Sequence, residues 1–294
     1  MAVQTADKSK SIVSKAIASL GDIATLPEVT IKIIDVVEDA DSTADDLQEV
    51  IKRDPALSAK ILRVVNSAFY GLPGQVADVE RASLLLGGVA VKNIAVAASL
   101  AKMFDGRQYP NLFPAKELWR HSIAVGVAAK RFTEVVGNPA GGDEFFLAGL
   151  IHDLGLLVER QVFPEELGEV CRRCNAGEGN FSQLEQEIIG ATHQAFGEAL
   201  TAQWRFPKSL QVAAGYHHSP QNLPDDFRSI GMILQTADIL CCQEELGLNL
   251  TAKDQEITQD LLDATGASTD QLEEVRGDLA EKLDKAEAAF DAKD

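Results

Sequence analysis

The chain has 294 residues, of which 46% are hydrophobic and 24% charged, and its formal net charge is −18 at pH 7. These values exclude a disordered or fibrous protein, and so negative a chain is unsuited to direct binding of nucleic acid or of an anionic membrane. The sequence has no run of 18 apolar residues, and its N-terminus lacks the apolar stretch of a signal peptide. We therefore expect a cytoplasmic protein.

The composition favours an all-α fold. Aromatic residues make up only 6% of the chain and proline occurs 10 times, whereas residues that favour helices prevail. The four cysteines are too few for a disulfide framework, so we expect reduced thiols at Cys171, Cys174, Cys241 and Cys242.

The first part of the chain predicts an N-terminal cap over residues 1–22 and a helical lobe over residues 23–104. Pro27 suits a first helical turn, and Thr43 with Asp46 resembles a capping box. Asp54 followed by Pro55 predicts the start of another short amphipathic helix.

Glycine pairs then separate further helices of this lobe. Residues 71–74 break the periodic pattern, and helices are expected from about residue 79 to residue 86 and over residues 89–104. Residues 105–114 contain Gly, Asn, Asp and two Pro without periodicity, so they predict a linker between two lobes.

The second lobe is expected to be a helical bundle over residues 115–250, followed by an acidic helical tail over residues 251–294. The tail carries a net charge of −8 and an amphipathic leucine pattern, and we expect it to pack loosely on the body. The bundle's predicted helices cover residues 115–132, 142–162, 164–176, 181–204, 207–216 and 225–246.

The histidines carry the chemical information of the bundle. The chain has only five, and each lies in or at the end of a predicted helix: His121, His152, His193, His217 and His218. Glu117 lies four residues before His121, which places both on one helix face, and Asp153 follows His152 within an apolar run. A charged pair in so apolar a helix needs a partner.

A metal ion would supply that partner. Imidazole nitrogens and carboxylate oxygens together suit a divalent metal such as Fe, Mn or Zn, and several helices can direct such ligands to one buried point. Asp153 is placed to bridge two ions, and Asp238, an acid in an apolar helix, would complete the ligand set. The alternative for each residue is a hydrogen-bonded side chain of the core or, for His217 and His218, a helix C-terminus.

The order of these residues resembles the ligand set of the HD superfamily of metal-dependent phosphohydrolases. The superfamily pattern, His then His-Asp then Asp, matches His121, His152, Asp153 and Asp238. The extra histidines and Glu117 are similar to ligands of the HD-GYP branch, which hydrolyses cyclic di-GMP. The resemblance implies that the metal ligands are Glu117, His121, His152, Asp153, His193, His217, His218 and Asp238.

The chain from about residue 23 to residue 246 is identified as a member of the HDOD (HD-related output domain) family. The resemblance is carried by DPALSAKILRVVNSAFYG at residues 54–71, by Leu86-Gly87, and by GLIHDLG at residues 149–155. HDOD proteins look like signalling outputs, and many lack the metal ligands that this chain retains. Polar residues Arg63, Asn66 and Ser67 are expected to fix the arrangement of the two lobes.

Two departures from the enzymatic relatives concern phosphate handling. Leu156 stands three residues after Asp153, where active HD-GYP and many HD enzymes have Lys, and no Gly-Tyr-Pro signature follows His218. The leading hypothesis is therefore a regulatory protein that holds one or two metal ions and binds a signalling partner or a small ligand such as a nucleotide.

Two alternatives stay open. The first is an active phosphohydrolase of phosphoesters or cyclic dinucleotides, in which Asp153 acts with a metal-bound hydroxide. The second is a metal-free helical interaction scaffold, in which the His and Asp side chains satisfy one another by hydrogen bonds.

Overall fold

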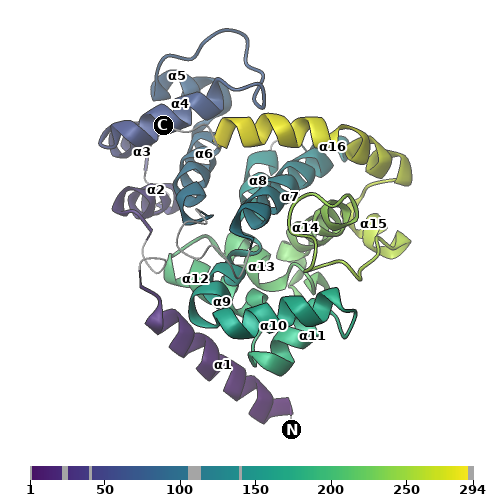
Figure 1. The fold of residues 1–294 in the computed structure, drawn as a ribbon. Coiled ribbons are helices and arrows are strands. Elements are labelled where there is room, and N and C mark those ends of the chain that lie inside the picture. The colour runs from purple at the N-terminus through teal and green to yellow at the C-terminus, as the bar shows by residue number, and fades with distance from the viewer. Residues whose placement is uncertain (1, 22–25, 40–41, 105–113, 139–140, 291–294) are drawn as a thin grey trace.

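The chain is entirely helical in the part that the structure describes. The computed structural model describes residues 2–21, 26–39, 42–104, 114–138 and 141–290, and within these ranges it contains no strand (Figure 1). The predicted all-α fold is confirmed. No helix in these ranges combines the length and the apolar character needed to cross a bilayer.

The N-terminal lobe consists of short helices whose caps follow the sequence. The Thr43 and Asp46 side chains form the expected capping box, and Asp54 accepts a hydrogen bond from the backbone N–H of Leu57. The elements are α2 (Glu28–Glu38), α3 (Ala44–Lys52), α4 (Pro55–Val65), α5 (Val79–Leu86), α6 (Gly88–Leu100) and the 3-10 helix η2 (Ala101–Phe104).

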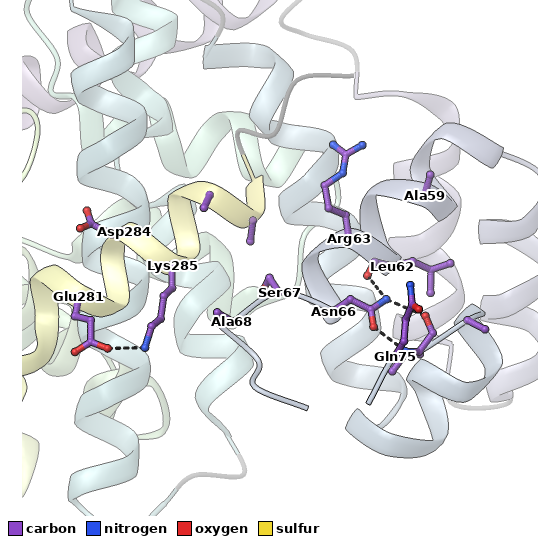
Figure 2. A pocket seen from close by; sticks show the side chains of 14 residues that line it. Ala59, Leu62, Arg63, Asn66, Ser67, Ala68, Gln75, Glu281, Asp284 and Lys285 are labelled. Atoms are coloured by element: carbon purple, nitrogen blue, oxygen red, sulfur yellow. Dashed lines mark hydrogen bonds and ion pairs between the residues drawn. The ribbon is translucent and has the colours of Figure 1, made fainter. Parts of the chain in front are cut away.

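Asn66 ties the loop between α4 and α5 to the end of α4. Its Nδ2 donates to the carbonyls of Leu62 and Val76, and its Oδ1 accepts from the N–H of Val76 (Figure 2). The partners of Asn66 lie within its own lobe, so this residue holds a loop. The contacts of Phe69 and Tyr70 join the lobes instead.

Phe69 and Tyr70 dock the N-terminal lobe on the bundle. Tyr70 Oη donates to Asp143 Oδ1 at 3.2 Å, and Lys130 Nζ donates to the same oxygen at 2.7 Å. The Lys130 ammonium also lies over both rings, and Phe69 packs against Phe146.

The bundle is built around α7, which lies against α8, α14 and α16. Gly126 and Gly149 allow α7 and α8 to approach closely, because a Cβ at Gly149 would lie 2.5 Å from the Cα of Gly126. The elements are α7 (Ala115–Val135), α8 (Gly142–Ile151), α9 (Leu154–Val162), α10 (Pro164–Asn175), α11 (Phe181–Ile188), α12 (His193–Gln203), α13 (Lys208–Tyr216), η5 (Pro220–Asn222) and α14 (Asp225–Gln243).

Two predicted helices are each divided in the structure. The expected helix over residues 142–162 ends at Ile151, and Asp153 forms the N-cap of α9 with non-helical dihedral angles. The expected helix over residues 181–204 is interrupted at Gly190, whose φ is +92°. The prediction of single long helices was wrong, because an apolar run hides the first break. The second break is a local glycine stop, in which the N–H of Gly190 donates to the carbonyl of Glu185.

The C-terminal part packs more tightly than the sequence indicated. It contains α15 (Gln259–Thr265) and α16 (Thr269–Phe290), and α16 crosses α7 toward α4 in Figure 1. The expectation of loose packing is wrong, because the leucines of α16 are buried and Arg131 of α7 pairs with Glu274 and Asp278. A groove of about 1150 Å³ separates α16 from α4 (Figure 2).

Outside these units, α1 (Ala2–Ser19) lies against α9 and α12. Of the predicted linker over residues 105–114, only Pro114 belongs to the described residues.

Candidate metal centre

Seven of the predicted ligand residues converge inside the bundle. They come from α7, the α8–α9 junction, the start of α12, the end of α13 and the middle of α14. The side chains of six are fully buried and that of His218 is 6% exposed. These residues are His121, His152, Asp153, His193, His217, His218 and Asp238.

Asp153 occupies the middle of the cluster and faces a different histidine pair with each carboxylate oxygen. Its Oδ2 lies 3.3 Å from His152 Nε2 and 3.9 Å from His121 Nε2. Its Oδ1 lies 3.4 Å from Nε2 of both His193 and His217. The break between α8 and α9 thus puts one carboxylate between two sets of nitrogen donors.

Asp238 closes the cluster from α14. Its Oδ1 accepts a hydrogen bond from His121 Nε2 at 3.0 Å, and its Oδ2 lies 3.5 Å from His218 Nδ1. The Cys242 thiol, one turn further along α14, donates to Oδ1 at 3.5 Å.

The outer ring nitrogens of three histidines are occupied by hydrogen bonds. Nδ1 of His152 lies 2.7 Å from the carbonyl of Gly149, Nδ1 of His217 lies 3.2 Å from two carbonyls of α13, and Nδ1 of His193 lies 2.7 Å from Glu185 Oε1. Because these partners are acceptors, we assign the ring protons to Nδ1. Nε2 of each ring therefore faces the centre, where its lone pair is available to a metal ion when that nitrogen carries no proton.

His193 and His217 approach each other closely inside the cluster. Their Nε2 atoms lie 3.2 Å apart, and both lie near Asp153 Oδ1. With Nδ1 protonated on both rings, the short Nε2–Nε2 distance requires positive charge there, either from a second proton on the His193 ring, whose pKa is raised, against the effect of burial, by Glu185 and Asp153, or from a metal ion.

Several buried polar atoms of the cluster have no hydrogen-bond partner among the described residues. Among the described residues, none hydrogen-bonds to either Asp153 oxygen, to His152 Nε2 or to Asp238 Oδ2. Buried polar groups are normally satisfied, and a divalent cation would satisfy this donor set of imidazole nitrogens and carboxylate oxygens. The residues therefore fit a metal ion.

Asp153 and His152 favour each other's charged forms within the cluster. Burial acts to raise the pKa of Asp153, but the adjacent His152 and other histidines outweigh it and hold the pKa well below its usual value. Burial acts to lower the pKa of His152, but Asp153 outweighs it and raises the pKa to about 9. Burial, assisted by His217, lowers the pKa of His218 well below its usual value.

Glu117 lies outside this cluster. Its side chain is exposed, although His121 one turn later is fully buried. The helix face that they share leaves the core at this point, where the backbone carbonyl of Glu117 accepts a hydrogen bond from Leu248. Leu156 is fully buried.

Three residues that contact the cluster were not predicted as part of the site. Glu185 holds His193, Gln255 Nε2 lies 3.2 Å from His218 Nδ1, and Cys242 contacts Asp238. Behind Glu185 lies Glu159, and burial, assisted by the Glu185 charge, raises its pKa well above the usual value. Only Glu185 carried a signal, since it lies on the apolar face of its helix with Phe181, Leu184 and Ile188.

Comparison with known protein families matches residues 23–220 to the HDOD domain. The chain belongs to the HDOD family. An HDOD protein of unknown function from Geobacter sulfurreducens has a TM-score of 0.80 at 19% identity, and the match covers 97% of this chain and 99% of that one.

Two further proteins are similar to this chain. A proposed phosphohydrolase from Shewanella amazonensis SB2B has a TM-score of 0.71 at 19% identity, with 95% of this chain and 98% of that chain covered. A curated, uncharacterized protein from Treponema pallidum (strain Nichols) is 23% identical over 214 residues, which cover 72% of this chain and 40% of the relative. This chain thus spans about two fifths of that relative's length.

Proposed function

We propose that this HDOD protein is a signalling protein whose bundle holds one or two divalent metal ions and acts by binding a partner or a small ligand. The observation that carries the proposal is the Asp153 carboxylate, which accepts no hydrogen bond from the described residues and faces two pairs of histidine nitrogens. The ion would be Fe, Mn or Zn, the divalent metals that suit mixed imidazole and carboxylate ligands.

The ligands divide into two sets that share Asp153. His121, His152 and Asp153 form one set. Asp153, His193, His217 and His218 form the other, and Asp238 contacts both through its two oxygens. A metal ion bound here supplies positive charge that polarises a bound oxyanion and lowers the pKa of a water ligand.

Binding is favoured over rapid turnover by the enclosure of the centre. Six of the seven residues have no exposed surface. Leu156, fully buried, takes the position at which the active relatives carry a lysine. A substrate would therefore meet few groups of this chain beyond the metal ligands.

The alternative function, a metal-dependent phosphohydrolase, is favoured by the bridging position of Asp153. Two-metal phosphoester hydrolysis uses a carboxylate shared between the ions, and Asp153 would hold that place. The Shewanella amazonensis relative, described as a proposed phosphohydrolase, lends this alternative further weight. The metal-free scaffold is disfavoured, because both oxygens of Asp153 and Nε2 of His152 are buried and have no hydrogen-bond partner among the described residues.

Elemental analysis of protein purified without chelators or a histidine tag tests the proposal. The wild type should carry Fe, Mn or Zn in near-stoichiometric amount, and Asp153→Ala should lose it. Glu117→Ala is the matched control, because it removes an exposed carboxylate close to His121 and should keep the metal. Wild-type protein without metal would refute both metal-dependent functions.

Hydrolysis assays of the metal-loaded protein then distinguish a binding function from a catalytic one. Under the proposed function, the metal-loaded protein binds its partner or ligand and does not hydrolyse phosphoesters or cyclic dinucleotides. Hydrolysis that disappears in Asp153→Asn while the Glu117→Ala rate is unchanged would establish the phosphohydrolase instead.

A further inference from the structure

A polar hollow of about 300 Å³ lies against His218, at the edge of the metal centre. One wall comes from the starts of α11 and α12 and includes Ser182 and Gln194. The other wall comes from the segment after α14 and includes Thr251, Asp254 and Gln255.

The hollow and the proposed metal centre share His218. Its side chain is 6% exposed, whereas the other cluster residues are fully buried. Nδ1 of His218 lies 3.5 Å from Asp238 Oδ2. This histidine is therefore the point at which a molecule in the hollow comes next to the centre.

Two buried polar atoms of the lining have no partner among the described residues. They are Nε2 of His218 and Oγ1 of Thr251, on opposite walls. Buried atoms of this kind are normally hydrogen-bonded, so the hollow is equipped to bind a polar molecule.

Gln255 fixes the ring of His218. Its Nε2 lies 3.2 Å from His218 Nδ1, while its Oε1 accepts from Gln235 Nε2 at 3.2 Å. Since the amide is oriented by Gln235, it presents an N–H to Nδ1. In the metal-free protein the proton of the neutral ring then belongs to Nε2, which is the unpartnered atom of the lining, and a bound ion would replace the Gln255 N–H at Nδ1.

The wall formed by Thr251, Asp254 and Gln255 lies outside the matched HDOD domain. The HDOD match ends at residue 220, so these residues come from outside it. The part of the chain expected to be a tail thus contributes to a cavity beside the candidate ligand set.

The charge of the lining residues limits the kinds of ligand that the hollow can bind. The lining includes no Lys or Arg, and its one charged side chain is Asp254, which is exposed at the rim. These walls cannot neutralise an anion, whereas divalent ions in the adjoining centre can. A volume of about 300 Å³ is at the lower end for small-molecule sites.

We infer that the hollow is a ligand site for a small molecule bearing one oxyanion group, no larger than a mononucleotide, with selectivity set by residues 250–255. The inference rests on the proposed function, because the anion's charge is balanced by the metal. Thr251 and His218 contribute hydrogen bonds, and Asp254 weakens the binding of anions.

Calorimetric titration of the metal-loaded protein with inorganic phosphate tests this site. Wild-type protein should bind phosphate, and chelator-treated protein should not. Ser182→Trp fills the hollow from its rim and should weaken phosphate binding by about tenfold or more, while the metal content is unchanged. A thermal melt of the variant verifies its fold.

A charge reversal tests the same site without filling it. Asp254→Lys should tighten phosphate binding by about two- to fivefold, as expected for an exposed charge near the ligand. Asp45→Lys is the matched control, since it makes the same charge change on an exposed residue of α3 in the other lobe and should leave binding unchanged.

The outcomes separate this inference from the function on which it rests. A wild-type protein that carries no metal overturns the proposed function. A protein that carries metal but does not bind phosphate, or binds it equally after Ser182→Trp and Asp254→Lys, overturns the ligand site alone. Displacement of phosphate by cyclic di-GMP would contradict the size limit.

Discussion

Nδ1 of His193 donates a hydrogen bond to Oε1 of Glu185 over 2.7 Å, and the backbone N–H of His193 donates to the same oxygen over 3.1 Å. One buried carboxylate oxygen thereby sets both the start of α12 and the orientation of a candidate ligand. Carboxylate partners of this kind fix the tautomer of a metal-binding histidine and raise its basicity.

Loss of this carboxylate should weaken metal binding. We expect Glu185→Ala to lower metal affinity by about 10- to 100-fold, and Glu185→Gln, which keeps an acceptor oxygen, to lower it less. Competition with a chromophoric chelator measures the affinity. Glu187→Gln on the same helix is the control, because Glu187 is exposed and pairs with Arg173, and an equal loss there would contradict the role of Glu185.

Metal affinity should increase with pH. The pKa of His152 in the metal-free protein is raised to about 9, so near neutral pH a proton occupies the ring nitrogen that binding requires. Releasing one proton should raise the affinity by about tenfold per pH unit up to about pH 9. Chelator titrations at several pH values measure the slope, and a flat profile would show that His152 is not a ligand.

The stability of the metal-free protein should change in the opposite direction. A histidine whose pKa is raised in the folded state contributes stability that is fully present below the ordinary value of 6.5. That contribution is lost as the pH rises through about 9. Urea unfolding of chelator-treated protein should show a larger loss between these values in the wild type than in His152→Ala.

Gly155 should not tolerate a side chain. A Cβ at this position would lie 1.8 Å from the carbonyl oxygen of His193, where α9 meets α12. Gly155→Ala should destabilise the fold by about 3 kcal/mol or more. Gly168→Ala is the control, because no atom lies within 4 Å of its added Cβ, and it should stabilise α10 by about 0.5–1 kcal/mol. Equal melting temperatures of both variants would contradict this close packing.

The loop after α4 should depend on Asn66. Asn66→Ala removes three hydrogen bonds and leaves the backbone groups of buried Val76 without partners, so it should destabilise the protein by about 1–3 kcal/mol. Gln75→Ala, a change of the exposed neighbour, should stay within about 0.5 kcal/mol. Chemical unfolding compares the stabilities of the two variants. A loss of stability in Asn66→Ala as small as that in Gln75→Ala would contradict the role of Asn66 in holding the loop.

The sequence predicted the helices with strong caps better than it predicted the interruptions in the bundle. Thr43 and Asp54 form the local caps that their residue types favour. The break at Asp153 left no such signal in the sequence, because its neighbours other than His152 are apolar residues and glycines and include no proline. That break decides the site, since it lets Asp153 face histidines from both sides.

The ligand set was predicted by order and residue type, and its neighbours were not. His121 and Asp238 are 117 residues apart, so no local periodicity relates them, and they were linked by their residue types in apolar helices and by the resemblance to a ligand pattern. Glu117 was included by the same resemblance and lies outside the cluster, with its side chain exposed. Gln255 could not be predicted, because its role depends on the path of the chain after α14.

The contact between His121 and Asp238 also spans most of the bundle along the chain. An ion held by both residues would close a loop of 117 residues, and cross-links over long loops remove much of the entropy of an unfolded chain. Metal supply would then set the resistance of the bundle to heat and proteases, so the amount of intact protein in a cell would follow the metal available to it.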